Sequence, residues 1–295
     1  MSGRIKRSIP VRMVGRSGGT VSGVSGVLRI SARNARFQQW QALLGNRTKR
    51  QRARLFLVHG VRPISLAVEH GWTIDTLIHP ADQPLSGWAS GLLDRVPATR
   101  VAMAPDLLRE LADREDGTPE LVAVVTMPAD DLDRIPVSGG LLVVVFDRPT
   151  SPGNIGTLVR SADAFGASGV IVTGHAADVY DPKAVRASTG SLFAVPVVRA
   201  ASHREVLAWL VGLPGAATVV GTDEHGAVDL GGQDLTGPVA LVIGNETAGL
   251  SVAWREACDV TIRIPIGGAA SSLNAAAAGT VVLYEAARQR RGGPA

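Results

Sequence analysis

Three glycine-rich segments in the second half of the chain carry most of the residue types that could do chemistry. Each follows a run of apolar residues, and the segments span residues 146–170, 241–251 and 264–290. Backbone N–H groups at a helix start and glycine-lined turns can hold an anionic or adenosine-like ligand. The segments contain neither a GxGxxG dinucleotide motif nor a GxxxxGK(S/T) phosphate loop, so a nicotinamide dehydrogenase and a P-loop NTPase are not indicated. The residues that stand out in them are Asn154, Arg160, Gly244, Asn245, Glu246, Ser271, Ser272 and Asn274.

Each of these residues also has an ordinary structural interpretation. Asn154 could cap a helix, Arg160 could be a solvated helix residue, and Glu246 could be an exposed turn carboxylate. Ser272 and Asn274 could satisfy the first turn of the last helix. For any one residue alone this interpretation is favoured. The ordered set, in which each segment follows a buried-type strand, favours a functional site.

The second half of the chain alternates apolar runs with helical segments. Continuous runs of Val, Ile and Leu are typical of strands that are buried on both faces. The sequence therefore predicts an α/β fold with a parallel sheet covered by helices on both sides, and ligands at the carboxyl ends of its strands. The predicted strands are 141–146, 169–173, 217–221, 239–243 and 260–266, and the predicted helices lie near 154–165, 182–189, 203–211, 251–257 and 272–290.

The first half predicts a smaller α/β domain. Ser31 is a candidate N-cap for a helix whose apolar residues, such as Phe37 and Trp40, recur at three- and four-residue spacing. Strands are predicted at 55–58, 76–80 and 121–127, and helices near 60–70, 87–94 and after Pro105. The predicted organisation is a flexible basic arm over 1–26, this domain over 27–128, an Asp-, Pro- and Gly-containing linker over 129–140, and a second domain over 141–295.

Basic residues are concentrated at the start of the chain. Residues 1–62 contain 14 Lys and Arg and no Asp or Glu, which leaves a net charge of −10 for the rest. Such a division indicates a polyanion-binding domain, and nucleic acid is the commonest intracellular polyanion. A solvated tail is the alternative, but over 26–62 the basic residues interleave with apolar ones. The predicted RNA-binding residues are Arg33, Arg36, Arg47, Lys49, Arg50, Arg52 and Arg54.

Composition excludes several classes of protein. With 295 residues, 45% hydrophobic and 19% charged, the chain is neither disordered nor a collagen-like repeat. The single cysteine, Cys258, allows no internal disulfide and no cysteine-based zinc site, and the six His residues form no metal motif. No apolar run approaches the ~18 residues of a membrane span, and no secretory signal is present. We therefore expect a cytoplasmic protein without metal or membrane contact.

The three polar segments resemble, in order, the three motifs of the SpoU/TrmH group of SPOUT RNA 2'-O-ribose methyltransferases. Asn154 and Arg160 match the N-x-G-x-x-x-R pattern of the first motif, IGNETAGLS matches the second, and IPIGGAASSLNAAAA matches the third. Residues 31–60 are similar to the substrate-binding domain that precedes the catalytic domain in many members. Within the group, the chain resembles the ribosomal-RNA enzymes that confer thiostrepton or avilamycin resistance. It departs from the usual pattern at His59, where Glu is common, and at Asn245, where a small residue is common.

The resemblance implies a fold, a cofactor and partners. It implies a small N-terminal α/β RNA-binding domain and a C-terminal parallel-sheet methyltransferase domain with a deep trefoil knot. It implies S-adenosylmethionine as the methyl donor and a homodimer whose active site is completed across the interface. The implied substrate is RNA, with 23S ribosomal RNA favoured by the separate basic domain. A transfer-RNA methyltransferase and a non-catalytic RNA-binding protein of the same fold are the alternatives.

The resemblance also assigns catalytic and binding roles by position. Arg160 would stabilise the developing charge on the ribose oxygen, and Asn154 would hold the Arg160 side chain. A general-base role for Arg160 is not favoured, because a guanidinium with a pKa above ~12 rarely gives up its proton. Ser272 and Asn274 would position the donor and the ribose. Glu246 would order the loops or contact the partner subunit. The residues implied to hold the donor are Thr222, Gly244, Asn245, Ile264, Ile266 and Leu273.

Overall fold

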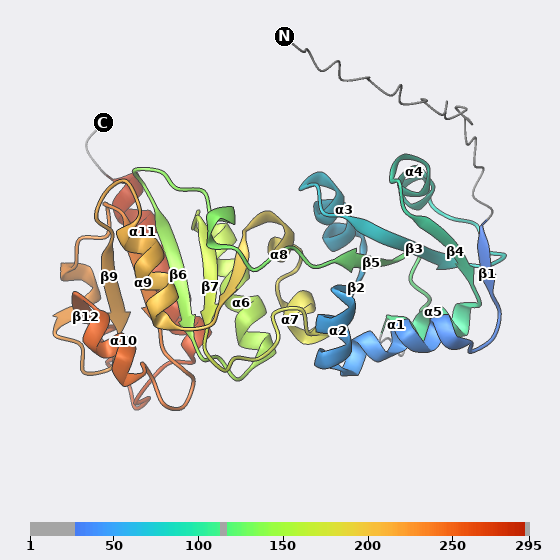
Figure 1. Ribbon diagram of the computed structural model, residues 1–295. Coiled ribbons are helices and arrows are strands. Elements are labelled where there is room, and N and C mark those ends of the chain that lie inside the picture. Colours follow the sequence, from blue (N-terminus) through green and yellow to red (C-terminus); the bar gives the residue numbers. More distant parts are fainter. Residues whose placement is uncertain (1–26, 113–116, 293–295) are drawn as a thin grey trace, which may run out of the picture.

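The computed structural model describes residues 27–112 and 117–292 and arranges them around two β-sheets (Figure 1). The first sheet takes its strands from residues 28–126 and the second from residues 142–263. The arm predicted over residues 1–26 lies outside the described residues. Within the described ranges, no helix is long and apolar enough to cross a membrane.

Five strands form the first sheet in the order β1-β4-β3-β5-β2. Strands β1, β4 and β3 run parallel, and β5 runs antiparallel to both β3 and β2. The three predicted strands are present to within two residues, whereas the short β1 and the Arg-containing β4 were not predicted. The strands are β1 Leu28–Ile30, β2 Leu55–His59, β3 Ile74–Pro80, β4 Thr99–Met103 and β5 Val122–Thr126, and the helices are α1 Ala35–Gly45, α2 Arg47–Ala53, α3 Val61–Glu69, α4 Gly87–Arg95 and α5 Pro105–Leu111.

Asn34, and not Ser31, caps the first helix. Its side chain accepts a hydrogen bond from Phe37 N at 2.9 Å, and the apolar residues that follow are buried at helical spacing as predicted. Asn46 ends α1 and caps α2 by accepting from Lys49 N at 3.0 Å. The basic run after Asn46 is therefore a helix, although its lack of apolar periodicity gave no sign of one.

Seven strands form the second sheet in the order β10-β12-β9-β11-β6-β7-β8, and every pairing in it is parallel, as predicted. The last predicted strand stops at Arg263 instead of continuing to 266, since Pro265 and two glycines follow. The strands are β6 Leu142–Asp147, β7 Gly169–Thr173, β8 Val197–Ala200, β9 Thr218–Thr222, β10 Val228–Asp229, β11 Val239–Ile243 and β12 Val260–Arg263, and the helices are α6 Pro152–Ala164, α7 Pro182–Ala187, α8 Ser191–Ala194, α9 His203–Val211, α10 Val252–Ala257 and α11 Ala275–Arg291, with 3-10 turns η1 Leu132–Arg134 and η2 Leu230–Gly232.

Helices cover both faces of the second sheet (Figure 1). Strand β6 shows how its side chains divide between two cores: Val144 and Phe146 pack on the face covered by α6 and α11, whereas Val143 and Val145 pack on the face covered by α9 and α10. All four side chains are fully buried. The covering of both faces that the continuous apolar runs predicted is therefore confirmed.

The connector between the two sheets, which its Asp, Pro and Gly content predicted to be a linker, packs against the second sheet. It contains the η1 turn, and Ile135 directly after that turn is buried against Gly169, where a Cβ would lie only 2.9 Å from the Ile135 side chain. Asp130, nearer its start, accepts from Arg199 Nε at 2.9 Å. Apolar residues and an ion pair therefore bind this segment to the second sheet.

Candidate functional site

The three polar segments meet at one edge of the second sheet. They follow strands β6, β11 and β12, and these strands run parallel within the order β12-β9-β11-β6. The carboxyl ends of parallel strands lie at the same edge, where side chains from separate loops can touch. Hydrogen bonds between the segments confirm that they touch.

Glu246 joins the second segment to the first. Its carboxylate accepts hydrogen bonds from the backbone N–H groups of Thr150 (2.9 Å) and Ser151 (3.0 Å), from the Thr150 hydroxyl (3.0 Å) and from Asn154 Nδ2 (3.0 Å). Partial burial opposes ionisation, but these hydrogen bonds outweigh it and hold the pKa of Glu246 below its ordinary value. The carboxylate also lies at the N-terminus of α6, where the helix dipole favours a negative charge. Glu246 is therefore an ionised anchor for the start of α6.

Asn154 and Asn274 join the first segment to the third. Asn274 Nδ2 donates to Asn154 Oδ1 at 3.2 Å, and Asn274 Oδ1 caps α11 by accepting from Ala276 N at 3.0 Å. Asn154 does not cap α6, because the Ser151 hydroxyl has that role. The two hydrogen bonds that link Glu246 to Asn154 and Asn154 to Asn274 thus connect all three segments. The capping interpretation holds for Asn274 and is wrong for Asn154.

Asn245 shapes the turn of the second segment. Its Oδ1 accepts from Thr247 N and Ala248 N, both at 2.9 Å, and its Nδ2 donates to Arg148 O at 2.7 Å. Gly244 beside it has no room for a side chain, because a Cβ would lie 2.4 Å from the backbone carbon of Gly249. An Asn at 245, in place of the common small residue, therefore closes the turn and ties it to the end of β6.

A cavity of about 680 Å³ opens beside these hydrogen bonds. All six predicted donor-binding residues line it, together with Glu246 and Ser272 from the predicted catalytic set. Four further charged residues in the lining, which were not predicted, follow β9, end β12 or lie on α10. The predicted donor-binding residues are Thr222, Gly244, Asn245, Ile264, Ile266 and Leu273, and the missed charged residues are Asp223, Glu224, Arg255 and Arg263.

The lining of this cavity is part apolar and part charged, and Asp223 in it pairs with Arg255 at 3.3 Å. Ile266 and Leu273 are 39% and 41% exposed although they are large and apolar. Exposed apolar side chains inside a cavity are typical of a wall that a ligand covers. Asp223 and Glu224 can accept from hydroxyl or ammonium groups. The described residues contain no cluster of three or more His, Cys, Asp or Glu side chains that could hold a metal ion.

Arg160 lies apart from the other predicted catalytic residues. It is exposed on α6, it does not line the cavity, and within the described residues its side chain makes no hydrogen bond or ion pair. Six helical positions separate it from Asn154, which amounts to about 240° around the helix and about 9 Å along it. The expectation that Asn154 holds Arg160 is therefore wrong, because the Asn154 amide is bonded to Glu246 and Asn274.

The prediction of RNA contact is wrong for Arg50. This side chain is 2% exposed and forms an ion pair with Asp178 at 2.8 Å, so it cannot reach a phosphate. Its acidic partner stands 128 positions away in the sequence, which is why the basic run alone gave no sign that Arg50 is buried. Lys49 and Arg52 on the same helix are exposed, and in the part of the chain that the structure describes their side chains make no hydrogen bond or ion pair.

The other predicted RNA-binding residues are exposed but have partners within the chain. Arg36 stacks over the ring of Trp40, with its guanidinium carbon 5.6 Å from the ring centre. The others use at least one guanidinium nitrogen in a bond to a carboxylate or a carbonyl. These bonds are Arg33 to Glu110 at 3.0 Å, Arg47 to Ala176 O at 2.6 Å, and Arg54 to Met127 O at 3.2 Å.

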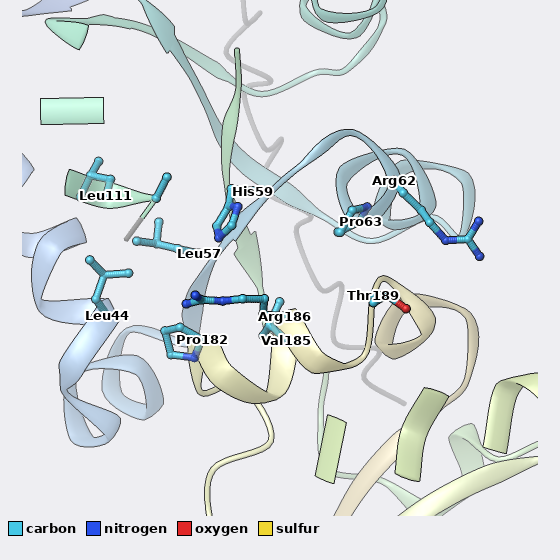
Figure 2. A pocket seen from close by; sticks show the side chains of 11 residues that line it. Leu44, Leu57, His59, Arg62, Pro63, Leu111, Pro182, Val185, Arg186 and Thr189 are labelled. Atoms are coloured by element: carbon cyan, nitrogen blue, oxygen red, sulfur yellow. The ribbon is translucent and has the colours of Figure 1, made fainter. Parts of the chain in front are cut away.

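A second cavity, of about 190 Å³, lies between the two sheets and contains His59 (Figure 2). Leu44 and Leu57 of the first half and Pro182 and Val185 of α7 give it mostly apolar walls. It lies away from the three polar segments, since none of them lines it. The unusual residue at position 59 therefore belongs to the junction of the two halves.

The chain matches two family models that together span most of its length. Residues 34–123 match the SpoU L30e-like domain and residues 141–284 match the SpoU rRNA Methylase family. A 23S rRNA (uridine(2479)-2'-O)-methyltransferase of Streptomyces viridochromogenes is 63% identical over 268 residues, which cover 90% of this chain and 93% of that protein. The chain belongs to the SpoU rRNA methylase family.

Solved structures of SpoU relatives share both halves of the fold. A crystal structure of the SpoU methyltransferase AviRb from Streptomyces viridochromogenes, in complex with the cofactor AdoMet, has a TM-score of 0.84 and 62% identity, and the match covers 89% of this chain and all of that one. An AdoMet-bound rRNA methyltransferase from Sinorhizobium meliloti has a TM-score of 0.79 and 32% identity over 89% of this chain and 98% of its own. The SpoU family resemblance of the three motifs is therefore confirmed.

Proposed function

We propose that this protein transfers a methyl group from S-adenosylmethionine to the 2'-hydroxyl of a ribose in 23S ribosomal RNA. The observation that carries the proposal is the convergence of the three SpoU motifs on one cavity, where Glu246, Asn154 and Asn274 bond them together. The 63% identical relative is a 23S rRNA 2'-O-methyltransferase and covers nearly the whole chain. Ribosomal RNA as the substrate would place the enzyme in the cytoplasm.

The cavity lining fits S-adenosylmethionine. That cofactor would supply an electrophilic methyl group on a sulfonium, together with an adenosine and an amino acid end. Ile264, Ile266 and Leu273 offer apolar surface for the adenosyl part, and the carboxylates of Asp223 and Glu224 suit its hydroxyl and ammonium groups. Gly244 allows the turn to close tightly behind the ligand.

Different residues serve the methyl donor and the ribose. Glu246, Asn154 and Asn274 hold the loops in register, so we assign them positioning roles. Ser272 lines the cavity and is available to the reacting groups. Arg160, which is exposed and has no ion-pair partner within residues 27–112 and 117–292, would stabilise negative charge as the ribose hydroxyl loses its proton, and water or a phosphate would take that proton.

The position of Arg160 supports a homodimer. Because Arg160 is outside the cavity of its own subunit, it would serve the cavity of the partner subunit in a two-fold dimer. The exposed apolar residues Val281 and Tyr284 on α11, at 38% and 52%, give a surface that such a partner could cover. The trefoil knot implied by the resemblance belongs to the same proposal.

Methylation of purified 23S ribosomal RNA tests the proposed function. The chain is incubated with the RNA and S-adenosylmethionine, and the modified ribose is mapped by primer-extension stops and by mass spectrometry of nucleosides. We expect one 2'-O-methylated nucleoside in 23S RNA. Methylation of transfer RNA alone would favour the first alternative, and RNA binding without methyl transfer would favour a non-catalytic protein.

Resistance to an antibiotic is a further part of the proposal. It rests on the resemblance to resistance methyltransferases and on the identity to the Streptomyces relative. Expression of the chain in a susceptible bacterium should raise the inhibitory concentration of avilamycin or thiostrepton. The Arg160→Ala variant is the control, since it should leave the inhibitory concentration unchanged.

A further inference from the structure

A buried arginine joins the two halves of the molecule. Arg50 on α2 donates from Nε to Asp178 Oδ2 at 2.8 Å and from NH2 to Asp181 Oδ2 at 3.3 Å, both in the second half. Its NH1 donates to Leu43 O at 2.7 Å and Leu44 O at 3.0 Å in the first half. One planar guanidinium is thus held by four acceptors, two on each side of the junction. This arrangement fixes the orientation of α2 relative to the second half as well as its distance from it.

Asp178 is as enclosed as Arg50. Its side chain is 3% exposed, and it also accepts from Gln51 Nε2 at 3.3 Å and from Tyr180 N at 3.1 Å. The neighbouring Arg47 donates to Ala176 O at 2.6 Å. Three side chains of α2 therefore hold the loop that leads into α7, and Figure 1 shows α2 beside α7.

Aromatic contacts form a second attachment between the halves. Phe56 of β2 packs on Tyr180 with ring centres 4.8 Å apart, and Trp72 meets Phe193 edge-on at 5.1 Å. Trp72 Nε1 also donates to Phe193 O at 3.1 Å. These rings are packed in a core shared by the two halves. These contacts hold the two halves together by apolar packing, whereas the hydrogen bonds of the ion pair fix their relative orientation.

The connector gives the halves little freedom to move apart. Arg54 at the end of α2 donates to Met127 O and Pro128 O, and Arg134 donates to Ala129 O at 3.0 Å and Val197 O at 3.2 Å. The connector is therefore tied to the first half at its start and to the second half further on. Rotation about it would break these bonds as well as the ion pair.

Helix α7 lies between the Arg50 ion pair and α6, the helix that carries Asn154 and Arg160. Asp181 caps α7 by accepting from Lys183 N at 2.9 Å, and α7 packs directly on α6. The contact has no room for a side chain at Gly156, the glycine of the first motif, where a Cβ would lie 2.2 Å from Ala184 O. The position of α2 is thus linked through α7 to α6, the helix that carries Arg160, the proposed catalytic arginine.

We propose that the Arg50–Asp178 ion pair positions the first half of the molecule relative to the methyl-transfer site and so selects which ribose is methylated. The inference rests on the proposed function. The first half carries Lys49 and Arg52, exposed members of the predicted RNA-binding set on α2, so we expect it to hold the RNA. RNA held there must present a single 2'-hydroxyl to a site on the second half, and small misplacements of reacting groups lower the rate strongly. Arg50 and Asp178 are positioning residues, because neither can touch the RNA or the cofactor.

The test replaces both partners at once. Loss of one partner would leave a buried, unpaired charge, so Arg50→Gln/Asp178→Asn is used to remove both buried charges together, along with the guanidinium bonds to Asp181 and to the carbonyls of Leu43 and Leu44. The matched control is Arg29→Gln/Asp82→Asn, which removes an exposed ion pair within the first half. Calorimetry with S-adenosylmethionine shows whether the cavity of each variant is intact.

Spin labels then report the arrangement of the halves without any need for activity. Labels are placed at Asp94→Cys and Val211→Cys, both exposed, and labelled chains are diluted with unlabelled ones. Cys258 can stay, because burial raises the pKa of its thiol to about 12 and leaves it unreactive at neutral pH. We expect a narrow distance distribution in the wild type and the control, and a broad one in Arg50→Gln/Asp178→Asn.

Methylation of 23S ribosomal RNA is the second measurement. We expect Arg50→Gln/Asp178→Asn to bind the donor normally, to lose up to about 100-fold in kcat/KM, and to spread primer-extension stops to neighbouring riboses. An unchanged distance distribution, or methylation of the same ribose at the wild-type rate, would overturn the inference. Absence of RNA methylation by the wild type would instead reject the proposed function. In that case a broad distribution in the variant would still support the positioning role, and a narrow one would reject it.

Discussion

The Glu246 carboxylate lines the cavity but is bonded to the start of α6. Its two oxygens accept four hydrogen bonds from Thr150, Ser151 and Asn154, which leaves them committed to the start of α6. Because these bonds lower its pKa, the native state favours the ionised form. The stabilisation is therefore present above the ordinary pKa of a glutamate and is lost as the pH falls through the lower native value.

Replacing Glu246 by Gln should weaken this anchor. An amide has only one acceptor oxygen, and its NH2 group would face N–H donors, so we expect about 1–3 kcal/mol lower stability at pH 7. Urea denaturation at pH 7 and pH 4 measures the effect. The difference between wild type and variant should shrink at the lower pH. An equal difference at both values would show that ionisation of Glu246 does not contribute.

Tyr180 offers the opposite case, a polar group that costs stability. Its hydroxyl is buried and has no hydrogen-bond partner among the described residues, and burial raises its pKa above that of a free phenol. We expect Tyr180→Phe to be neutral or stabilising by about 1–3 kcal/mol in thermal denaturation, since it removes an unsatisfied group and keeps the ring contacts. Trp72→Phe is the contrasting variant, because it loses the bond to Phe193 O. Marked destabilisation by Tyr180→Phe would reveal a partner for the hydroxyl.

The contact between α6 and α7 depends on a residue without a side chain. Gly156→Ala would place a methyl group 2.2 Å from Ala184 O, so the two helices would have to separate. We expect a loss of about 1–3 kcal/mol in stability. Gly91→Ala in α4 is the control, since nothing lies within 4 Å of its Cβ and alanine should stabilise that helix by about 0.5–1 kcal/mol. Equal effects of the two substitutions would contradict the close packing at Gly156.

Helix α2 has two sides with different tasks. Arg50 and Arg47 bind the second half of the molecule, while Lys49 and Arg52 face solvent. We expect Lys49→Gln and Arg52→Gln each to reduce the slope of log affinity for RNA against log salt by about 0.7–0.9. The exposed Arg204 on α9 supplies the control, since Arg204→Gln should leave the slope unchanged. A wild-type slope in both α2 variants would make this face of the helix a solvated one.

Local patterns predicted most elements because burial on two faces leaves a continuous apolar run, as at Val143 to Phe146. Short elements such as β10 were not predicted, because a strand of two residues is too short to show an alternating apolar pattern. At the site, the strand ends predicted where a ligand would bind, and the family resemblance of the three motifs supplied the residues that line the cavity. They could not predict the Asn154–Asn274 bond or the burial of Arg50, because both depend on partners more than a hundred positions away.

The separation of Arg160 from its own cavity has a consequence for mixed oligomers. If Arg160 serves the partner, a pair of Arg160→Ala and Leu273→Arg chains contains one complete site. Leu273 is suitable because its side chain is 41% exposed in the cavity, so a bulky cation there should block the donor and spare the core. We expect each variant alone to be inactive and the mixture to recover methyl transfer. No recovery after verified subunit exchange would place Arg160 and the donor in the same subunit.

The placement of β5 bears on the order in which the protein can form during synthesis. Strand β2 pairs only with β5 within the described part of the first sheet, yet β5 follows it by more than sixty residues, at Val122–Thr126. Arg50 on the adjoining helix α2 lacks its ion-pair partner for even longer, until Asp178 has been synthesised. A nascent chain that has not reached β5 therefore exposes an unpaired β2 and an unmatched charge next to it. Slow translation before residue 126 would prolong the stage at which this edge is open to aggregation.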